Sequence, residues 1–222
     1  MSRPASKISG QPSPRRRLTR EDRQRQLLDV AWRLIREEGT DALTLGHLAE
    51  RAGVTKPVVY DHFVTRQGLL AALYDEFDAR HTALMDAALA NSEPTLASRA
   101  AVIAASYVDC VLAGGREIPG VMAALAGSPE LEKIKHDCAV AFMAKCRTVL
   151  APFAPARTIT PAGLWAMLGA AEGLSQAAAM QDIAAAEARD ELVAIIVAMV
   201  GRNAGQATQG ARRGGRSRRD VS

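Results

Sequence analysis

Three segments with helical spacing of their apolar residues lie between residues 19 and 63, separated by Gly39 and Gly53. Where two helices cross closely, a small residue is needed at the crossing and a glycine suits the tight turn between them. An apolar residue is then needed on the inner face of the next helix. Ala49, Gly53 and Val59 stand in this order, four and six residues apart. The spacing predicts a helix-turn-helix.

Threonines precede each of these segments. Thr19, Thr44 and Thr55 can each cap a helix by accepting a hydrogen bond from a free backbone N–H group. A fourth helix is predicted from near Thr65 to about Ala90, before a proline interrupts the pattern.

The second segment contains Gly46, where glycine costs roughly 1 kcal/mol relative to alanine. Close approach of the first helix and close approach of a ligand such as DNA both explain this glycine.

The remainder of the chain is rich in alanine and shows no alternating strand pattern. Further helices are predicted near residues 95–113, 118–126, 129–150, 161–181 and 186–203. Aromatic residues make up only 4% of the chain, which favours helices over strands. We therefore predict an all-α protein of about nine helices.

Positive charge is concentrated at the two ends of the chain. Residues 1–20 carry six cations and no acid, and residues 202–222 carry six arginines and one acid, so residues 21–201 are left with 16 cations and 23 acids. Basic ends suit a polyanion such as DNA. For the C-terminal end, a solubilising role without a fixed partner explains the charge equally well. By composition, residues 1–18 and 204–222 are predicted to be a disordered basic arm and tail.

The string TLGHLAERAGVTKPVVYDHF, which spans Thr44–Phe63 and precedes a Leu-Leu pair at 69–70, resembles the signature of the TetR family of regulators. The resemblance covers about residues 19–78. It implies a DNA-binding domain at 19–64 with its motif at about 44–63. A connecting helix at 65–90 and a helical effector-binding and dimerisation domain at 91–203 would follow.

The resemblance also assigns contacts with double-stranded DNA. These fall on Thr44, Thr55, Lys56, Pro57, Val58, Tyr60, His62 and Arg66. The two threonines lie at helix N-termini, which suit a phosphate. Tyr60, His62 and Arg66 are also expected at phosphates. Lys56, Pro57 and Val58 are expected at base edges in the major groove. The N-terminal arginines are expected to enter the adjacent minor groove.

One helix-turn-helix contacts only a few base pairs, so we expect a homodimer on a palindromic operator with half-sites ~34–36 Å apart. Residues 161–180 carry small residues at helical spacing, and residues 192–200 are apolar around most of the helix. The resemblance implies that the last two helices pair across the dimer; an intramolecular core is the alternative. The expected interface residues are Gly169, Gly173, Ala177, Leu192, Ile195, Ile196 and Met199.

A small hydrophobic effector of unknown identity is expected among the middle helices. Large apolar or polarisable residues there are the candidate contacts, with core packing as the alternative for each: Tyr107, Met122, Phe142, Met143, Trp165 and Met167.

No nucleotide-binding loop, catalytic motif or metal-ligand spacing occurs in the sequence. The four histidines are scattered, and Cys110, Cys138 and Cys146 lack a zinc pattern. We therefore expect no catalytic residue, no metal and no cofactor, and an enzyme is disfavoured. The N-terminus lacks the apolar stretch of a secretory signal, and no long uninterrupted apolar window indicates a membrane span, so a cytoplasmic protein is expected.

The predicted function is a transcriptional repressor that a small effector releases from DNA. An activator or a ligand-independent DNA-binding protein of the same fold is the alternative. A helix-turn-helix that has become a protein-interaction module is less favoured, because Lys56, Tyr60, His62 and the basic arm suit DNA.

Overall fold

The computed structural model describes residues 18–115, 117–154 and 158–214, and these residues are helical with no strand. The elements are α1 (Arg20–Glu38), η1 (Thr40–Ala42), α2 (Leu45–Ala52), α3 (Lys56–His62), α4 (Arg66–Ala90), α5 (Leu96–Ala113), α6 (Glu117–Leu125), α7 (Pro129–Leu150), η2 (Ala151–Phe153), α8 (Pro161–Ala179) and α9 (Ala185–Gly214). The η elements are single 3₁₀ turns. The nine α-helices of the described residues confirm the predicted all-α class.

The caps of the N-terminal helices follow the predictions with one exception. The hydroxyl groups of Thr19, Thr44 and Thr65 accept hydrogen bonds from backbone N–H groups at 3.1, 3.1 and 3.0 Å. Thr55 precedes α3 but makes no side-chain cap bond. Pro57 has no N–H group to offer, and the N–H of Val58 bonds instead to the Thr55 carbonyl at 3.0 Å. The predicted cap at Thr55 is therefore wrong.

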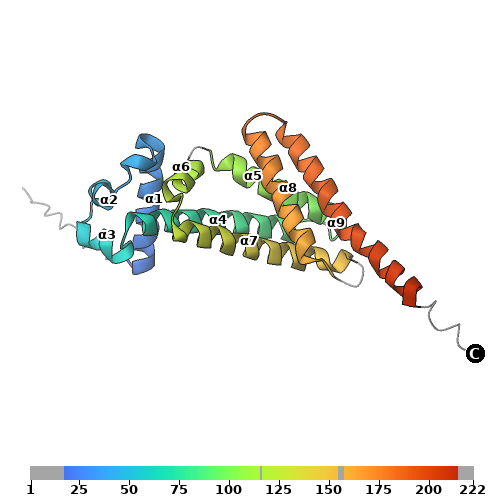
Figure 1. Ribbon diagram of the computed structural model, residues 1–222. Coiled ribbons are helices and arrows are strands. Elements are labelled where there is room, and N and C mark those ends of the chain that lie inside the picture. The colour runs from blue at the N-terminus through green and yellow to red at the C-terminus, as the bar shows by residue number, and fades with distance from the viewer. Residues whose placement is uncertain (1–17, 116, 155–157, 215–222) are drawn as a thin grey trace, which may run out of the picture.

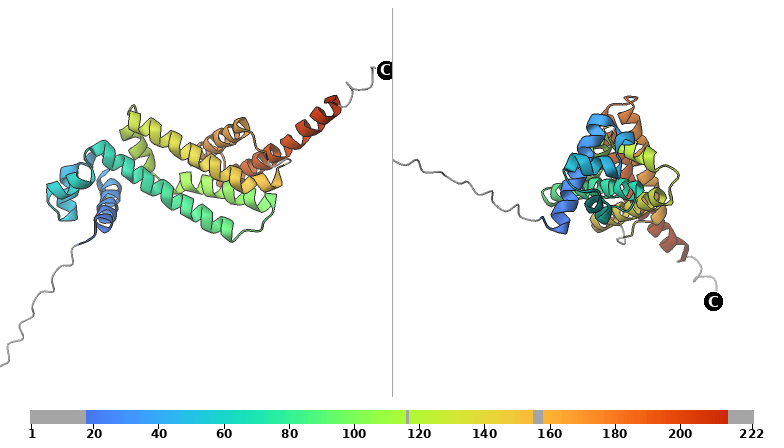
Figure 2. Two further views of the ribbon diagram at one scale, coloured as in Figure 1. Left: turned by 90° about the horizontal axis from the view of Figure 1, so that it is seen from below. Right: turned by 90° about the vertical axis from the view of Figure 1, so that its left-hand side faces the viewer.

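The helices form an elongated molecule with α1, α2 and α3 at one end and the α8–α9 pair at the other (Figure 1). Helices α4 and α7 run along its length and join the two ends (Figures 1 and 2). Helix α4 therefore contacts both ends, and a displacement of α4 would change the position of α1, α2 and α3 relative to the other helices.

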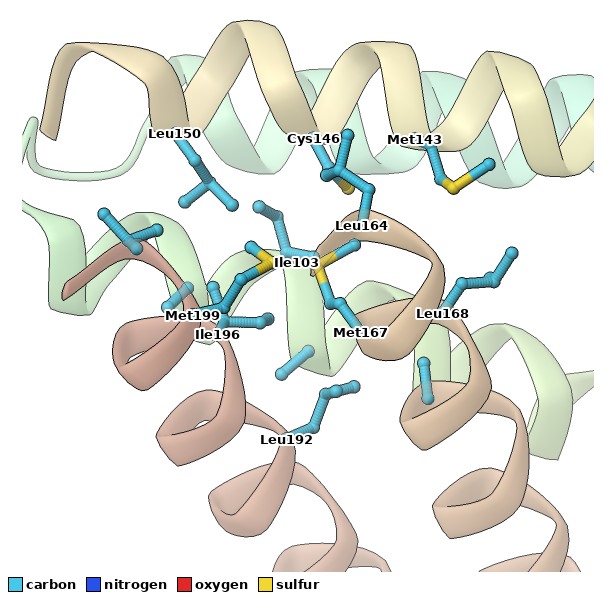
Figure 3. Close-up of a cluster of buried hydrophobic side chains, with 14 of the residues drawn as sticks. Ile103, Met143, Cys146, Leu150, Leu164, Met167, Leu168, Leu192, Ile196 and Met199 are labelled. Carbon is cyan, nitrogen blue, oxygen red and sulfur yellow. The ribbon is translucent and has the colours of Figure 1, made fainter. Parts of the chain in front are cut away.

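Two hydrophobic cores hold the fold together. The first core joins α1, α2, α3 and the start of α4, and it also takes Val121 and Leu125 from α6 and Leu131 from α7. The second core lies between α5, α7, α8 and α9, where Ile103, Leu150, Met167, Leu192 and Met199 converge, among others (Figure 3). Because α6 contributes to the first core, the N-terminal domain is packed against the rest of the chain.

The C-terminal helix is longer than predicted. A disordered tail was expected from residue 204, but α9 continues to Gly214 and extends beyond the body of the molecule (Figure 2). Alanine, glutamine and arginine all have good helix propensity, and no proline interrupts the segment. The predicted arm falls largely on residues 1–17 and the end of the tail on residues 215–222, both outside the described residues.

Helix α5 is long and apolar enough, by length and composition, to cross a membrane. It packs against α4, α7, α8 and α9, and its buried residues Ala100, Ile103, Ala104 and Val108 belong to the second core. A core helix of a soluble protein meets the same criteria, so α5 is weak evidence for a membrane span.

Candidate nucleic-acid interface and interior cavity

The turn between α2 and α3 has the geometry predicted from its spacing. Gly53 adopts a left-handed conformation, with φ 65° and ψ 34°, and ends α2. The Val54 N–H group bonds to the Ala49 carbonyl at 3.0 Å. Ala49 and Val59 are almost completely buried, with Phe63 beside them in the first core. The inner face of α3 is therefore anchored by apolar packing, which leaves its outer face free.

The outer face of α3 carries Lys56, Pro57 and Tyr60, all of which are exposed. Tyr60 is 51% exposed although its side chain is large and mostly apolar. Val58 is half-buried, and Val64, just after the helix, is 82% exposed. An exposed tyrosine beside a lysine offers two hydrogen-bond donors on one surface, as a phosphate backbone requires.

Lys56 is the cation at the start of α3, and it forms no ion pair among the described residues. Its side chain lies over Gly46: a Cβ atom built on Gly46 would be 3.7 Å from Lys56 Cε and 3.9 Å from its Nζ. That is ordinary van der Waals contact, and no atom of α1 is closer. Approach of α1 therefore does not explain Gly46.

The basic residues of α2 are neutralised within the chain. Arg51 pairs with Glu37 and, at 3.0 Å, with Glu38. His47 Nε2 lies 3.0 Å from Glu38 as well. The positive charge that α2 and α3 present to a partner consequently comes from Lys56.

The C-terminal end of α3 is tied to α1 by Arg20, whose Nη2 donates to the Asp61 carbonyl at 3.1 Å. His62 is half-buried, and its buried Nδ1 atom has no hydrogen-bond partner. Burial, followed by the charge of Arg20, lowers the pKa of His62 below its ordinary value. Any DNA contact of His62 at neutral pH would therefore be made by an uncharged ring.

Arg66 has a different role from the one predicted. Its Nε and Nη2 donate to the carbonyls of Leu43 and Thr40, each at 2.8 Å. These bonds hold η1 and the start of α2 against the N-terminus of α4. The guanidinium is thus directed into the protein, which does not favour the expected phosphate contact.

An interior cavity of about 240 Å³ lies between α4, α5, α6, α7 and α8. Tyr107 and Phe142 line it, with their ring centroids 5.2 Å apart. Larger clefts of about 720 and 630 Å³ lie between α1 and α6, but Arg36 and Glu117 line both of them. The smaller cavity has the more apolar wall, as expected for a small-molecule site.

The other four residues predicted to contact an effector do not line this cavity. Met143 and Met167 are buried in the second core (Figure 3). Met122 packs against the first core, and Trp165 is 49% exposed on α8. For these four residues the effector contact stays a prediction that this cavity does not support, because helical spacing alone does not tell a cavity wall from a core or a surface.

Several cavity residues were missed at the level of sequence. Tyr74, Phe77, Asp78 and His81 form a continuous stripe on α4 with spacing i, i+3, i+4 and i+7. Phe77 and His81 stack with their centroids 4.1 Å apart. The mixture of aromatic and polar side chains on an otherwise apolar face is a signal that could have identified them.

Two cysteines also line the cavity. Burial, and then the charge of Asp78, raises the pKa of Cys110 and of Cys138 to about 12. Both are therefore protonated thiols at neutral pH. Among the described residues, no three His, Cys, Asp or Glu side chains are grouped to hold a metal ion.

Three of the residues predicted at the dimer interface are buried within their own chain. Leu192, Ile196 and Met199 point into the second core of the same chain (Figure 3) and are at most 3% exposed. Gly169 and Gly173 are exposed, whereas Ala177 and Ile195 are half-buried. A helix that is apolar all round does not reveal which face meets its own chain, and here the most apolar face does so.

Comparison with known proteins supports the assignment of the N-terminal helices. Residues 27–73 match the family model of bacterial regulatory proteins of the TetR family. The chain is 40% identical over 65 residues to the class D tetracycline repressor protein of Escherichia coli, covering 29% of this chain and 28% of that protein. It is also 40% identical over 57 residues to the transcriptional activator FasR of Mycolicibacterium smegmatis, covering 26% of each.

The matches to these curated relatives thus span little more than a quarter of the relatives' length. The fold, in contrast, matches solved structures over almost their whole length. A TetR transcription regulator from Haloarcula marismortui superposes with a TM-score of 0.62 at 14% identity, covering 82% of this chain and 98% of that one. At that identity the likeness concerns the fold alone. The helix-turn-helix and the matched family model show that residues 27–73 carry the N-terminal DNA-binding domain of TetR-family regulators, and the described helices share the all-α fold of a solved regulator.

Proposed function

We propose that this protein is a sequence-specific, DNA-binding transcriptional regulator that acts in the cytoplasm as a homodimeric repressor. The observation that carries the proposal is the outer face of α3, where Lys56, Pro57 and Tyr60 are uncovered while the inner face is packed on α2. A short exposed helix of this kind fits the major groove of DNA.

Dimerisation is proposed through the exposed face of α8 and α9. Trp165 and Val197 are large apolar residues exposed on these two helices. Ala166, Gly169 and Gly173 are exposed on α8 as well, and such small residues allow a second helix to approach closely. Two recognition helices related by a two-fold axis would then meet a palindromic operator.

Release of DNA is proposed to follow when a small effector occupies the interior cavity. Helix α4 carries cavity residues such as Phe77 and, at its N-terminus, the Arg66 bonds that hold η1 and α2. Trp32 Nε1 also donates to Glu76 at 2.6 Å, which ties α1 to the same helix. An effector that binds best with α4 displaced shifts the population away from the DNA-binding arrangement.

The relationship to FasR, which is named as an activator, favours an activator as the second candidate. Both candidates require the same α3 surface, and transcription from the selected operator in the presence and absence of the protein distinguishes them.

Selection of bound fragments from random DNA tests the proposal directly. We expect an enriched palindrome, and Tyr60→Ala should weaken binding to that palindrome and to unrelated DNA alike. Lys56→Ala should reduce the slope of log K against log salt by about one, because one phosphate or base contact is lost. Lys133→Ala on α7 removes the same charge outside the helix-turn-helix and serves as the matched control. Failure to enrich any duplex at low salt would overturn the proposal.

A further inference from the structure

The interior cavity concentrates the few aromatic side chains of this protein. The chain has nine Phe, Tyr and Trp residues in all, and four of them line this cavity: Tyr74, Phe77, Tyr107 and Phe142. They come from α4, α5 and α7, and so form more than one wall. Aromatic faces carry negative electrostatic potential and attract cations.

Two carboxylates line the same cavity. Asp78 is half-buried on α4, one helical turn from Tyr74. Burial, and to a smaller extent the charge of Asp78, raises the pKa of Tyr74. Glu172 on α8 lines the cavity with Tyr107, and burial, followed by the charge of Glu172, raises the pKa of that tyrosine. Each acid therefore stands next to one of the aromatic rings.

Neither of these acids is neutralised by the described residues. Asp86 and Asp109 pair with Lys145 and Arg189 at 2.6 and 2.5 Å, but no salt bridge reaches Asp78 or Glu172. The Cys138 thiol donates a hydrogen bond to Asp78 without carrying a charge. Lys135 and His81 also line the cavity, and Lys135 is exposed and pairs with neither acid. Glu172 is exposed and Asp78 is half-buried. Partial withdrawal of the Asp78 carboxylate from water without a counter-charge is costly, so the cavity favours a ligand that supplies a positive charge.

We propose that the effector is a small organic cation, a protonated amine or quaternary ammonium on an apolar body. The charged group would lie between Asp78 and Glu172, and the body against the four aromatic rings. This inference rests on the proposed function in taking the cavity as the effector site. The volume of about 240 Å³ is below the roughly 300–1,000 Å³ of typical ligand pockets, which limits the ligand to less than drug size.

Three compounds with one apolar body and different charges test the proposal: 4-phenylbutylamine, 4-phenylbutan-1-ol and 4-phenylbutyrate. Their binding to the full-length protein without DNA is measured by titration calorimetry. We expect the amine to bind at least about tenfold more tightly than the alcohol, and the carboxylate to bind most weakly. If the alcohol binds as tightly as the amine, or the carboxylate more tightly through Lys135, the proposal is overturned.

Variants then locate the charge recognition. Glu172→Gln and Asp78→Asn should each reduce the ratio of amine to alcohol affinity by about threefold or more, and binding of the alcohol shows that the cavity has folded. Glu93→Gln, in the exposed connection between α4 and α5, is the matched control and should leave the ratio unchanged. A ratio insensitive to both cavity substitutions would contradict the assigned position of the cation.

The effect of the amine on operator binding is measured separately. Binding of the amine without any change in DNA affinity would refute effector-controlled release while leaving the cation site in place. DNA release by a neutral or anionic compound only would refute the proposed cationic effector but not the proposed function as an effector-controlled regulator.

Discussion

Replacing Arg66 with methionine tests whether this cation braces the fold or contacts a DNA phosphate. The side-chain stem is retained, while the hydrogen bonds to the Leu43 and Thr40 carbonyls, both at 2.8 Å, are lost. A hydrogen bond to a charged group contributes about 1.5–3 kcal/mol when buried. Because Arg66 is only half-buried and water can reach part of the vacated space, we expect a loss of about 2–3 kcal/mol for the pair.

The free energy of unfolding is measured by urea denaturation followed by circular dichroism, and heating should give a Tm lowered by about 4–12 °C. The salt dependence of operator binding is measured on the same variant below its transition. If Arg66 braces η1 and α2, stability falls and the salt slope stays unchanged. Wild-type stability with a slope smaller by about one would refute the bracing role and restore the phosphate contact.

Three further predictions concern local packing and ionisation. Gly46→Ala should raise the free energy of unfolding by up to about 1 kcal/mol, because the new Cβ meets only ordinary van der Waals contacts. Weaker operator binding by this more stable variant would show that close approach of DNA requires the glycine. Gly120→Ala should lower the free energy of unfolding by about 1–3 kcal/mol, because the new Cβ would lie 2.5 Å from Thr40 Oγ1. Adding Thr40→Ala should recover most of this loss, whereas additive losses in the double variant would contradict the clash. Cys146 is buried and Cys110 and Cys138 are half-buried, and burial raises the pKa of each thiol to about 12. The three thiols should therefore react slowly with iodoacetamide at about pH 8 until urea unfolds the chain. The free energy of unfolding should decline above about pH 9, because the thiols ionise in the unfolded chain while those of the native protein stay protonated. Rapid alkylation of the native protein, or stability that is flat above pH 9, would contradict this.

Coupling between the two ends of the molecule depends on elements that touch both. Helix α4 holds the DNA-binding end through Arg66 and Glu76 and contributes Phe77 to the cavity. Helix α6 meets η1 at the close approach of Gly120 to Thr40 and supplies Ile118 to the cavity wall. A ligand that moves either helix therefore acts on the support of α2 and α3.

The amino-acid sequence by itself determined the helices and the turn of the DNA-binding motif. Caps such as Thr44, the left-handed Gly53 and the inward spacing of Ala49 and Val59 act within a few residues of one another, so local sequence contains the necessary information. The same holds for the all-α class. The sequence also contained the specific string by which the family is identified.

Only the tertiary structure decided which faces of the later helices meet one another. The segment 192–200 is apolar on nearly every side, so its periodicity does not show that Leu192 and Met199 face α5 and α8 of the same chain. The cavity brings together Asp78 and Glu172, which are 94 positions apart in the sequence. Arg66 points inward because it donates hydrogen bonds to the carbonyls of Leu43 and Thr40, more than 20 residues earlier in the chain. Such arrangements depend on how whole helices pack, and packing is a property of many side chains at once rather than of any local pattern.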